Sequence, residues 1–215
     1  MIQTNLNLGD DIQYSILINR IEYNTEKMSQ EELFDSLKKI QKKYPKSIIQ
    51  LFSTRYLINK NHLIYAIYFT LKAYHRKTLI SHRPSIELLL YLSANRQIEE
   101  GIKNFGMTDQ ELKKGILNYC IAANEPKIAT VNRDFLQHFD HKEKSLKLKI
   151  DSVDEFNRIK NLFKITDTQL KTKLHSLGVH RMNPNLKNQE DITLLSTALC
   201  DLIVEKMVLL SLEST

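Results

Sequence analysis

The side chains best able to do chemistry in this sequence are two histidines and two neighbouring glutamates. His138 and His141 lie three residues apart with Asp140 between them, and on one helix they could share a metal ion. No third metal ligand follows close by. Glu99 and Glu100 are adjacent, so on a helix they point in different directions and suit no paired-carboxylate mechanism. The spacing of these residues therefore gives weak support to catalysis.

The two cysteines also lack the setting of a reactive site. Cys120 and Cys200 lie in the apolar stretches LNYCIAA and TALCDLI, which favours buried free thiols in a reducing compartment over a disulfide. The 5 glycines are scattered, so no Gly-rich phosphate loop is present, and there is no nucleophile elbow or kinase motif. We expect a binding protein that is not an enzyme and uses no metal or cofactor. The alternative is an enzyme centred on His138 and His141.

Composition favours one soluble domain with an anionic partner. The chain has 215 residues, of which 42% are hydrophobic and 26% charged, and a formal net charge of +6. This excess of basic residues raises the odds of RNA contact without identifying it. No apolar run reaches the length of a membrane span. The start, MIQTNLNLGDD, lacks the basic and apolar regions of a signal peptide, so we expect a cytoplasmic protein.

The segment 81–107 predicts the most strongly marked helix of the chain. Pro84 fits the first helical position, and Gly106 fits a left-handed residue just after the end, so we expect one long central helix over 84–105. Residues 88–92 are apolar on every side, which predicts neighbours all round them. After Ala94 the apolar residues thin to a one-sided inward stripe, Ile98, Ile102 and Phe105.

The rest of the chain alternates between predicted strands and helices. Ser29 and Glu32 form a capping-box pattern for one of these helices, Pro45 ends it, and Asn61 is the expected cap of the next. Strands are expected at 11–23, 47–58, 115–123 and 145–150, and further helices at 29–44, 61–74, 132–139, 151–165, 167–177 and about 188–212. This order indicates an α/β (α+β) single domain.

The central stretch carries a pattern that resembles a known family. From Glu87 to Gly106 the sequence reads E-LL-YLS-x-x-RQI-x-x-(A/G)-I-x-x-x-G, which resembles the kinase-binding subunit of the KEOPS/EKC tRNA-modification complex, the PRPK-binding protein family, in its archaeal type. The resemblance covers about 45–212. It leaves 1–45 as an N-terminal extension and 166–188 as a probable insertion. It implies a small mixed sheet wrapped by helices.

The same resemblance implies two partners. One is the small atypical kinase of the complex, which the subunit binds and regulates. The other is tRNA, recruited by its single-stranded 3′ end for threonylcarbamoyladenosine modification, with the chemistry left to other subunits. A stand-alone RNA-binding protein with no kinase partner is the alternative function.

The last helix is the candidate surface for the kinase. Its apolar residues cover more than half of its circumference, so it is either enclosed on all sides or keeps one stripe for a partner helix. In the resembling family the C-terminal helix helps to dock the kinase. If this transfers, the exposed kinase-binding stripe consists of Leu195, Leu199, Leu202, Lys206 and Leu209.

The candidate surface for tRNA is basic. Arginine suits phosphate because its planar fork donates two parallel hydrogen bonds. For Arg96 the alternative is an ion pair with Glu100 on the surface of the same helix. The expected tRNA-binding residues are Lys72, Arg76, Lys77, Arg83, Arg96 and Gln97, to which Lys171, Lys173 and Arg181 could add.

Overall fold

The structure is a computed structural model that describes residues 1–9, 12–123, 127–179 and 189–212. Five strands form one sheet in the order β1-β2-β4-β3, with β5 pairing to β2. Their bounds are β1 Ile2–Asn7, β2 Gln13–Tyr23, β3 Ile48–Leu51, β4 Ile116–Ala123 and β5 His141–Glu143. The α/β class is confirmed. The sheet was expected to be mixed, but every pairing among the described residues is antiparallel.

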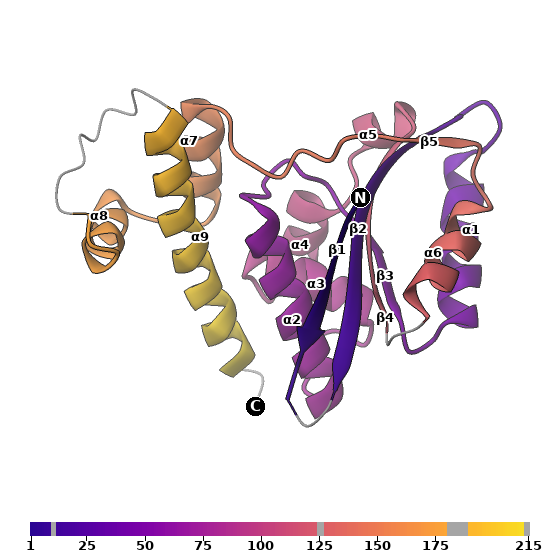
Figure 1. Cartoon of the computed structure of the whole chain (residues 1–215), viewed down its shortest axis with the longest axis horizontal. Helices are drawn as coiled ribbons and strands as arrows, with labels where there is room; N and C mark the ends of the chain where they lie inside the picture. The colour runs from indigo at the N-terminus through magenta and orange to yellow at the C-terminus, as the bar shows by residue number, and fades with distance from the viewer. Residues whose placement is uncertain (10–11, 124–126, 180–188, 213–215) are drawn as a thin grey trace.

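Helices cover both faces of this sheet (Figure 1). On one face lie α1 Gln30–Lys43 and α6 Ile128–Leu136, and α5 Asp109–Lys113 adds Leu112 to their core. On the other lie α2 Lys60–Arg76, α3 Pro84–Ser93 and α4 Ile98–Phe105. An outer layer, packed on the second group, consists of α7 Val153–Leu162, α8 Asp167–Ser176 and α9 Gln189–Leu212.

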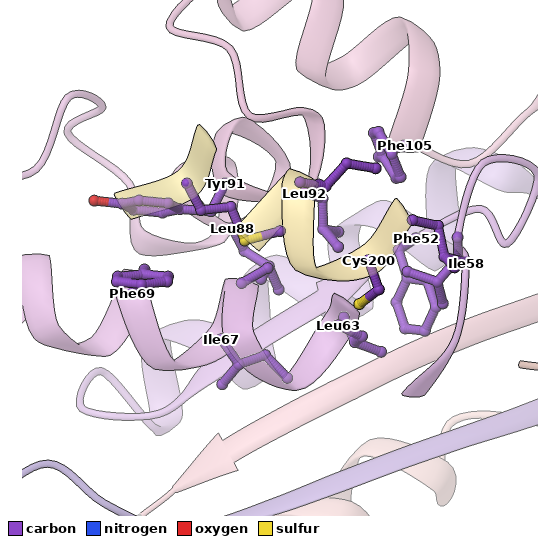
Figure 2. Close-up of a cluster of buried hydrophobic side chains, with 14 of the residues drawn as sticks. Phe52, Ile58, Leu63, Ile67, Phe69, Leu88, Tyr91, Leu92, Phe105 and Cys200 are labelled. Atoms are coloured by element: carbon purple, nitrogen blue, oxygen red, sulfur yellow. The ribbon is translucent and has the colours of Figure 1, made fainter. Parts of the chain in front are cut away.

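The alternation of β2 sends its side chains into two separate cores. Ile16 and Ile18 enter the core shared with α2, α3 and α9, whereas Leu17 and Ile21 enter the core shared with α1 and α6. Because both faces are covered, the strand is apolar on both sides and not only on one. Figure 2 shows the first core, where Cys200 of α9 points into the same cluster as Leu63 of α2.

The prediction of one central helix over 84–105 is wrong, because the structure divides this segment into α3 and α4. Ala94 adopts a left-handed conformation (φ 44°), and Asn95 then accepts a hydrogen bond from the Gln97 N–H (2.9 Å). The chain turns back so that α4 packs on α3. A Cβ on Gly101 would lie 3.2 Å from the backbone of Leu89, so this glycine permits the close crossing.

The helix ends marked in the sequence agree with the structure only in part. The capping box of Ser29 and Glu32 is present at the start of α1. The cap of α2 is Asn59 and not Asn61, and its side chain accepts from the His62 N–H at 3.0 Å. Gly106 was expected to be left-handed, but its φ is −67°, and a Cβ there would meet the carbonyl oxygen of Ile102 at 2.5 Å.

Two strand predictions need correction. The segment 145–150 is not a strand, although its leucines are half-buried and its lysines exposed, because no neighbouring strand pairs with it among the described residues. The predicted strand at 47–58 is shortened to β3, Ile48–Leu51. Beyond it the Ser53 N–H donates to the carbonyl of Phe105 in α4 and not to a strand. The strand β1 was not expected. Position 11 of the first expected strand and positions 180–188 of the probable insertion lie outside the described residues.

Candidate binding surfaces

The connection between α2 and α3 gathers four of the expected tRNA-binding residues. Lys72 and Arg76 lie one turn apart on α2, Lys77 follows as its left-handed C-cap (φ 58°), and Arg83 precedes α3. The ammonium group of Lys72 lies 5.4 Å from the centre of the Tyr68 ring. Arg76, Lys77 and Arg83 are exposed. These cations are therefore close in the chain and accessible to an anion.

A buried carboxylate fixes the shape of this connection. Glu87 is fully buried, and its side chain accepts hydrogen bonds from the backbone N–H groups of Ile80 (3.2 Å) and Ser81 (2.7 Å). Burial raises the pKa of Glu87, and these hydrogen bonds and the charge of Arg96 oppose the shift. Glu87 thus ties the segment that carries Arg83 to the first turns of α3.

Arg96 and Gln97 lie at the other end of α3. This helix has 10 residues and a length of about 15 Å, so the expected basic set is divided into two groups. The charge of Arg96 nevertheless acts along α3, because it partly offsets the rise that burial causes in the pKa of Glu87. It likewise opposes the rise in the pKa of Tyr91, which burial brings to about 12. Arg96 precedes α4, so it does not share a helix with Glu100 as expected. Glu100 instead lies 3.6 Å from Lys103.

The C-terminal region adds little to the cationic surface that could bind tRNA. Lys173 of α8 forms ion pairs with Glu205 (2.9 Å) and Asp201 (3.6 Å) of α9, so its charge is balanced within the fold. Lys171 is exposed, and Arg181 lies outside the described residues. The main cationic surface is therefore the α2–α3 connection.

The helix α9 stays packed on the core as far as Met207 and Leu210, but the other side of its last turns is open. Leu170 and Leu174 of α8 are buried in the core that α9 shares. Leu199 is fully buried, so its assignment to an exposed stripe is wrong. Leu195, Leu202 and Lys206 are half-buried, and Leu209 is 59% exposed.

Two neighbours of Leu209 were missed. Val208 is 38% and Leu212 62% exposed, and both lie within one helical turn of Leu209. We call Val208, Leu209 and Leu212 the C-terminal apolar patch. The sequence indicated that α9 has too much apolar surface for one contact, but gave no signal for which end stays open.

A second exposed apolar pair lies on α4. Ile98 and Ile102 were expected to face inward, but they are exposed. The buried residues of this helix are Gly101, Asn104 and Phe105, and Gly101 lies against the backbone of Leu89 in α3. The inward stripe predicted for this segment is therefore correct only at Phe105.

The residues considered for catalysis are dispersed or inert. The described residues contain no group of three His, Cys, Asp or Glu side chains that could hold a metal ion, and His141 Nδ1 contacts the carbonyl of Phe139 (3.0 Å). Cys120 and Cys200 are buried and free, as expected. Burial raises the pKa of each thiol to about 12, which makes it a poor nucleophile.

Among the helices that the structure describes, none combines the length and apolar character that a membrane crossing requires. A comparison with curated proteins found no match. The family model of kinase binding protein CGI-121 matches residues 15–210, from β2 almost to the end of α9. The match includes α1, α8 and the broken α3–α4 segment. Because it spans most of the chain, the protein belongs to the CGI-121 family of kinase binding proteins.

Proposed function

We propose that this protein is the non-catalytic subunit of a cytoplasmic KEOPS complex that binds and regulates the small atypical kinase of that complex. It recruits tRNA by the 3′ end for threonylcarbamoyladenosine modification. The family match over residues 15–210 is the observation that carries the kinase part of the proposal. The pattern from Glu87 to Gly106 supports the KEOPS part.

The C-terminal apolar patch supports a docking role for the end of α9. Its three residues extend beyond the last ion pairs between α8 and α9, which involve Asp201 and Glu205. Exposed apolar side chains at a helix end fit a partner helix or groove. The kinase-binding surface proposed here is therefore Leu209 with Val208 and Leu212, flanked by Leu202, Lys206 and Leu195.

The basic connection between α2 and α3 supports the tRNA part. Arg76, Lys77 and Arg83 are exposed, and Glu87 holds the segment before Arg83 in a fixed shape. Cations on a fixed backbone bind phosphate with a smaller loss of conformational entropy than cations on a loose loop. Lys72, Arg96 and Gln97 complete the proposed tRNA-binding set.

The kinase part is tested by calorimetric titration of the purified kinase with Leu209→Asp. A charge in the centre of an apolar contact is expected to weaken binding at least ~10-fold. Leu177→Asp is the matched control, because Leu177 is an exposed leucine at the end of another helix, α8. Equal affinity for wild type and both variants would remove the C-terminal apolar patch from the interface.

The tRNA part is tested by filter binding with intact tRNA and tRNA lacking its 3′ end. Arg96→Glu is expected to abolish the preference for the intact end. Arg133→Glu, an exposed arginine of α6 on the opposite face of the sheet, is expected to keep it. Binding that ignores both the 3′ end and Arg96, and falls steeply with salt, would instead support a stand-alone RNA-binding protein.

A further inference from the structure

The strand β3 forms one edge of the sheet, since β4 is its only partner strand among the described residues. In an antiparallel pair, the N–H and C=O groups of successive residues alternate between facing the partner and facing away. The Phe52 N–H donates to the Asn118 carbonyl of β4 (2.9 Å). By this alternation, Ile49 and Leu51 direct their backbone groups away from β4. That side is where a further strand would pair.

One side chain already imitates such a strand. The Gln41 amide of α1 accepts from the Ile49 N–H (3.3 Å) and donates to the Ser47 carbonyl (2.7 Å). The backbone N–H and C=O groups of an added strand would use the same two partners. The Gln41 amide also donates to the carbonyl of Tyr44 (3.2 Å). The first part of the edge is therefore closed by a side chain that can rotate away.

The next part of the edge is open. No other residue that the structure describes forms a hydrogen bond with the Ile49 carbonyl or the Leu51 N–H. Within the described ranges, the Leu51 carbonyl accepts only from the side chain of the adjacent Gln50 (2.5 Å). A donor and an acceptor that lack partners among the described residues, two residues apart on an edge strand, are the groups that strand addition uses.

A groove runs along this edge with a volume of about 930 Å³. One wall is α1, which presents Phe34 (43% exposed) and Leu37, and the other is the start of α3 with Arg83 and Pro84. The backbone of β3 lies between these walls, while the side chains of Ile48, Ile49 and Leu51 are buried. An extended chain in the groove would reach the β3 backbone and place alternate side chains on Phe34.

The charge of the groove favours an acidic occupant. Its cations are Lys38, Lys42 and Arg83, with His82 beside them, and its acids are Glu31 and Asp35. Asp35 is already paired with Lys38 at 2.9 Å. Lys42 and Arg83 stand on opposite walls, and neither has an acidic partner among the described residues. A segment between them would be attracted if it carried carboxylates.

We propose that the β3 edge binds an extended acidic segment of a partner protein as an additional strand, and that this segment displaces the Gln41 side chain. The backbone of β3 supplies hydrogen bonds, Phe34 receives an apolar side chain, and Lys42 and Arg83 attract the carboxylates. This surface lies apart from the C-terminal apolar patch, because its α1 wall is on the opposite side of the sheet from α9 (Figure 1). It shares Arg83 with the proposed tRNA-binding set.

The probe is a fluorescein-labelled peptide of sequence EVEFEVE, whose binding to the full chain is followed by fluorescence anisotropy. Two control peptides separate backbone pairing from charge. One has the same side chains with alternate amides N-methylated, and the other is KVKFKVK. Strand addition predicts that both bind at least ~10-fold more weakly than EVEFEVE. Equal binding of the N-methylated peptide would overturn the proposal without requiring any protein variant.

Three variants locate the site. Gln41→Ala is expected to bind EVEFEVE ~3- to 10-fold more tightly, because the competing amide is gone. Lys42→Glu is expected to bind ~10-fold more weakly. Lys39→Glu, a neighbouring exposed lysine outside the groove, is the matched control and should bind like the wild type. Circular dichroism checks that each variant is folded.

A second copy of this chain is the competing occupant. Sedimentation velocity of the wild type and Gln41→Ala decides this point, since a dimer through β3 would strengthen when Gln41 is removed. A dimer that EVEFEVE fails to dissociate would overturn the proposal. A monomer in both proteins, together with peptide binding that requires free amides, supports it.

Discussion

The helices α3 and α9 have the same kind of sequence, apolar around most of the circumference, yet α3 has no exposed residue whereas α9 leaves several apolar residues exposed. Residues Leu88 to Leu92 of α3 are at most 2% exposed, because α2, α4, α9 and the sheet surround them (Figure 2). In α9 the neighbours are α2, α3, α7 and α8, and they leave Val208, Leu209 and Leu212 uncovered.

The difference separates apolar residues that stabilise the fold from apolar residues that remain available to a partner. An all-round apolar helix needs more cover than one neighbour gives, but its sequence does not say whether the cover comes from the same chain. Within α9 both cases occur, since Leu199 is buried and Leu209 is open. A leucine in α3 should therefore contribute to folding stability, and a leucine at the end of α9 to binding.

The largest expected effect is the loss of Tyr91 from α3. Its ring is fully buried and stacks on Phe69 of α2, with ring centres 5.7 Å apart. Tyr91→Ala should lower the free energy of unfolding by about 3–5 kcal/mol, because it leaves a large cavity. Urea denaturation measures this change. A loss below about 1 kcal/mol would mean that the enclosure of α3 is not tight.

The pH dependence of stability tests the contact that holds the end of α3. His62 of α2 is fully buried between the Leu92 carbonyl, 2.9 Å from Nε2, and the Ile58 N–H, which donates to Nδ1 at 3.4 Å. The neutral ring with its proton on Nε2 satisfies both contacts. Burial lowers the pKa of His62 to about 4, below its usual value of about 6.5.

Because the folded protein binds this proton less well than the unfolded chain, the stability is complete above about pH 6.5 and is lost as the pH falls. The loss should level off below about pH 4 and amount to about 3 kcal/mol. Urea midpoints between about pH 7 and pH 4 measure it. His62→Gln, which cannot titrate, should lack this component, and an unchanged pH dependence in that variant would exclude His62 as its source.

A smaller effect is expected where α8 covers α9. Lys173→Ala removes the ion pairs with Glu205 and Asp201, which lie on exposed or partly exposed side chains. Such pairs contribute little, so the free energy of unfolding should change by less than about 1 kcal/mol. Hydrogen exchange of the α8 amides is the sharper measurement. Faster exchange in α8 than in α3 would show that the cover of α9 opens locally.

The smallest effect on stability is expected at Leu209. Leu209→Ala should change the free energy of unfolding by no more than about 0.5 kcal/mol, since the side chain is mostly in water already. The kinase affinity should nevertheless fall, by an amount that calorimetric titration measures. A large loss of stability with unchanged kinase affinity would reverse the contrast between the two helices.

Rules that depend on residues close together in the sequence predicted the elements marked by side-chain alternation or by cap residues. The strand β2 and the capping box of Ser29 and Glu32 follow from alternation and cap chemistry, which involve residues close together in the sequence. The segment 145–150 shows the limit of such rules. Its leucines are half-buried and its lysines exposed, as in a strand, but a strand also requires a partner strand, and the described residues supply none there.

The sequence by itself determined the α/β class, the buried free thiols and the membership of a kinase-binding family, since these depend on composition, periodicity and a shared pattern. Only the tertiary structure decided the break at Ala94 and the enclosure of Leu199. It also decided the closure of the β3 edge by Gln41. Each of these is set by which segments meet in space, because the same side chain is buried or exposed according to the neighbour that packs against it.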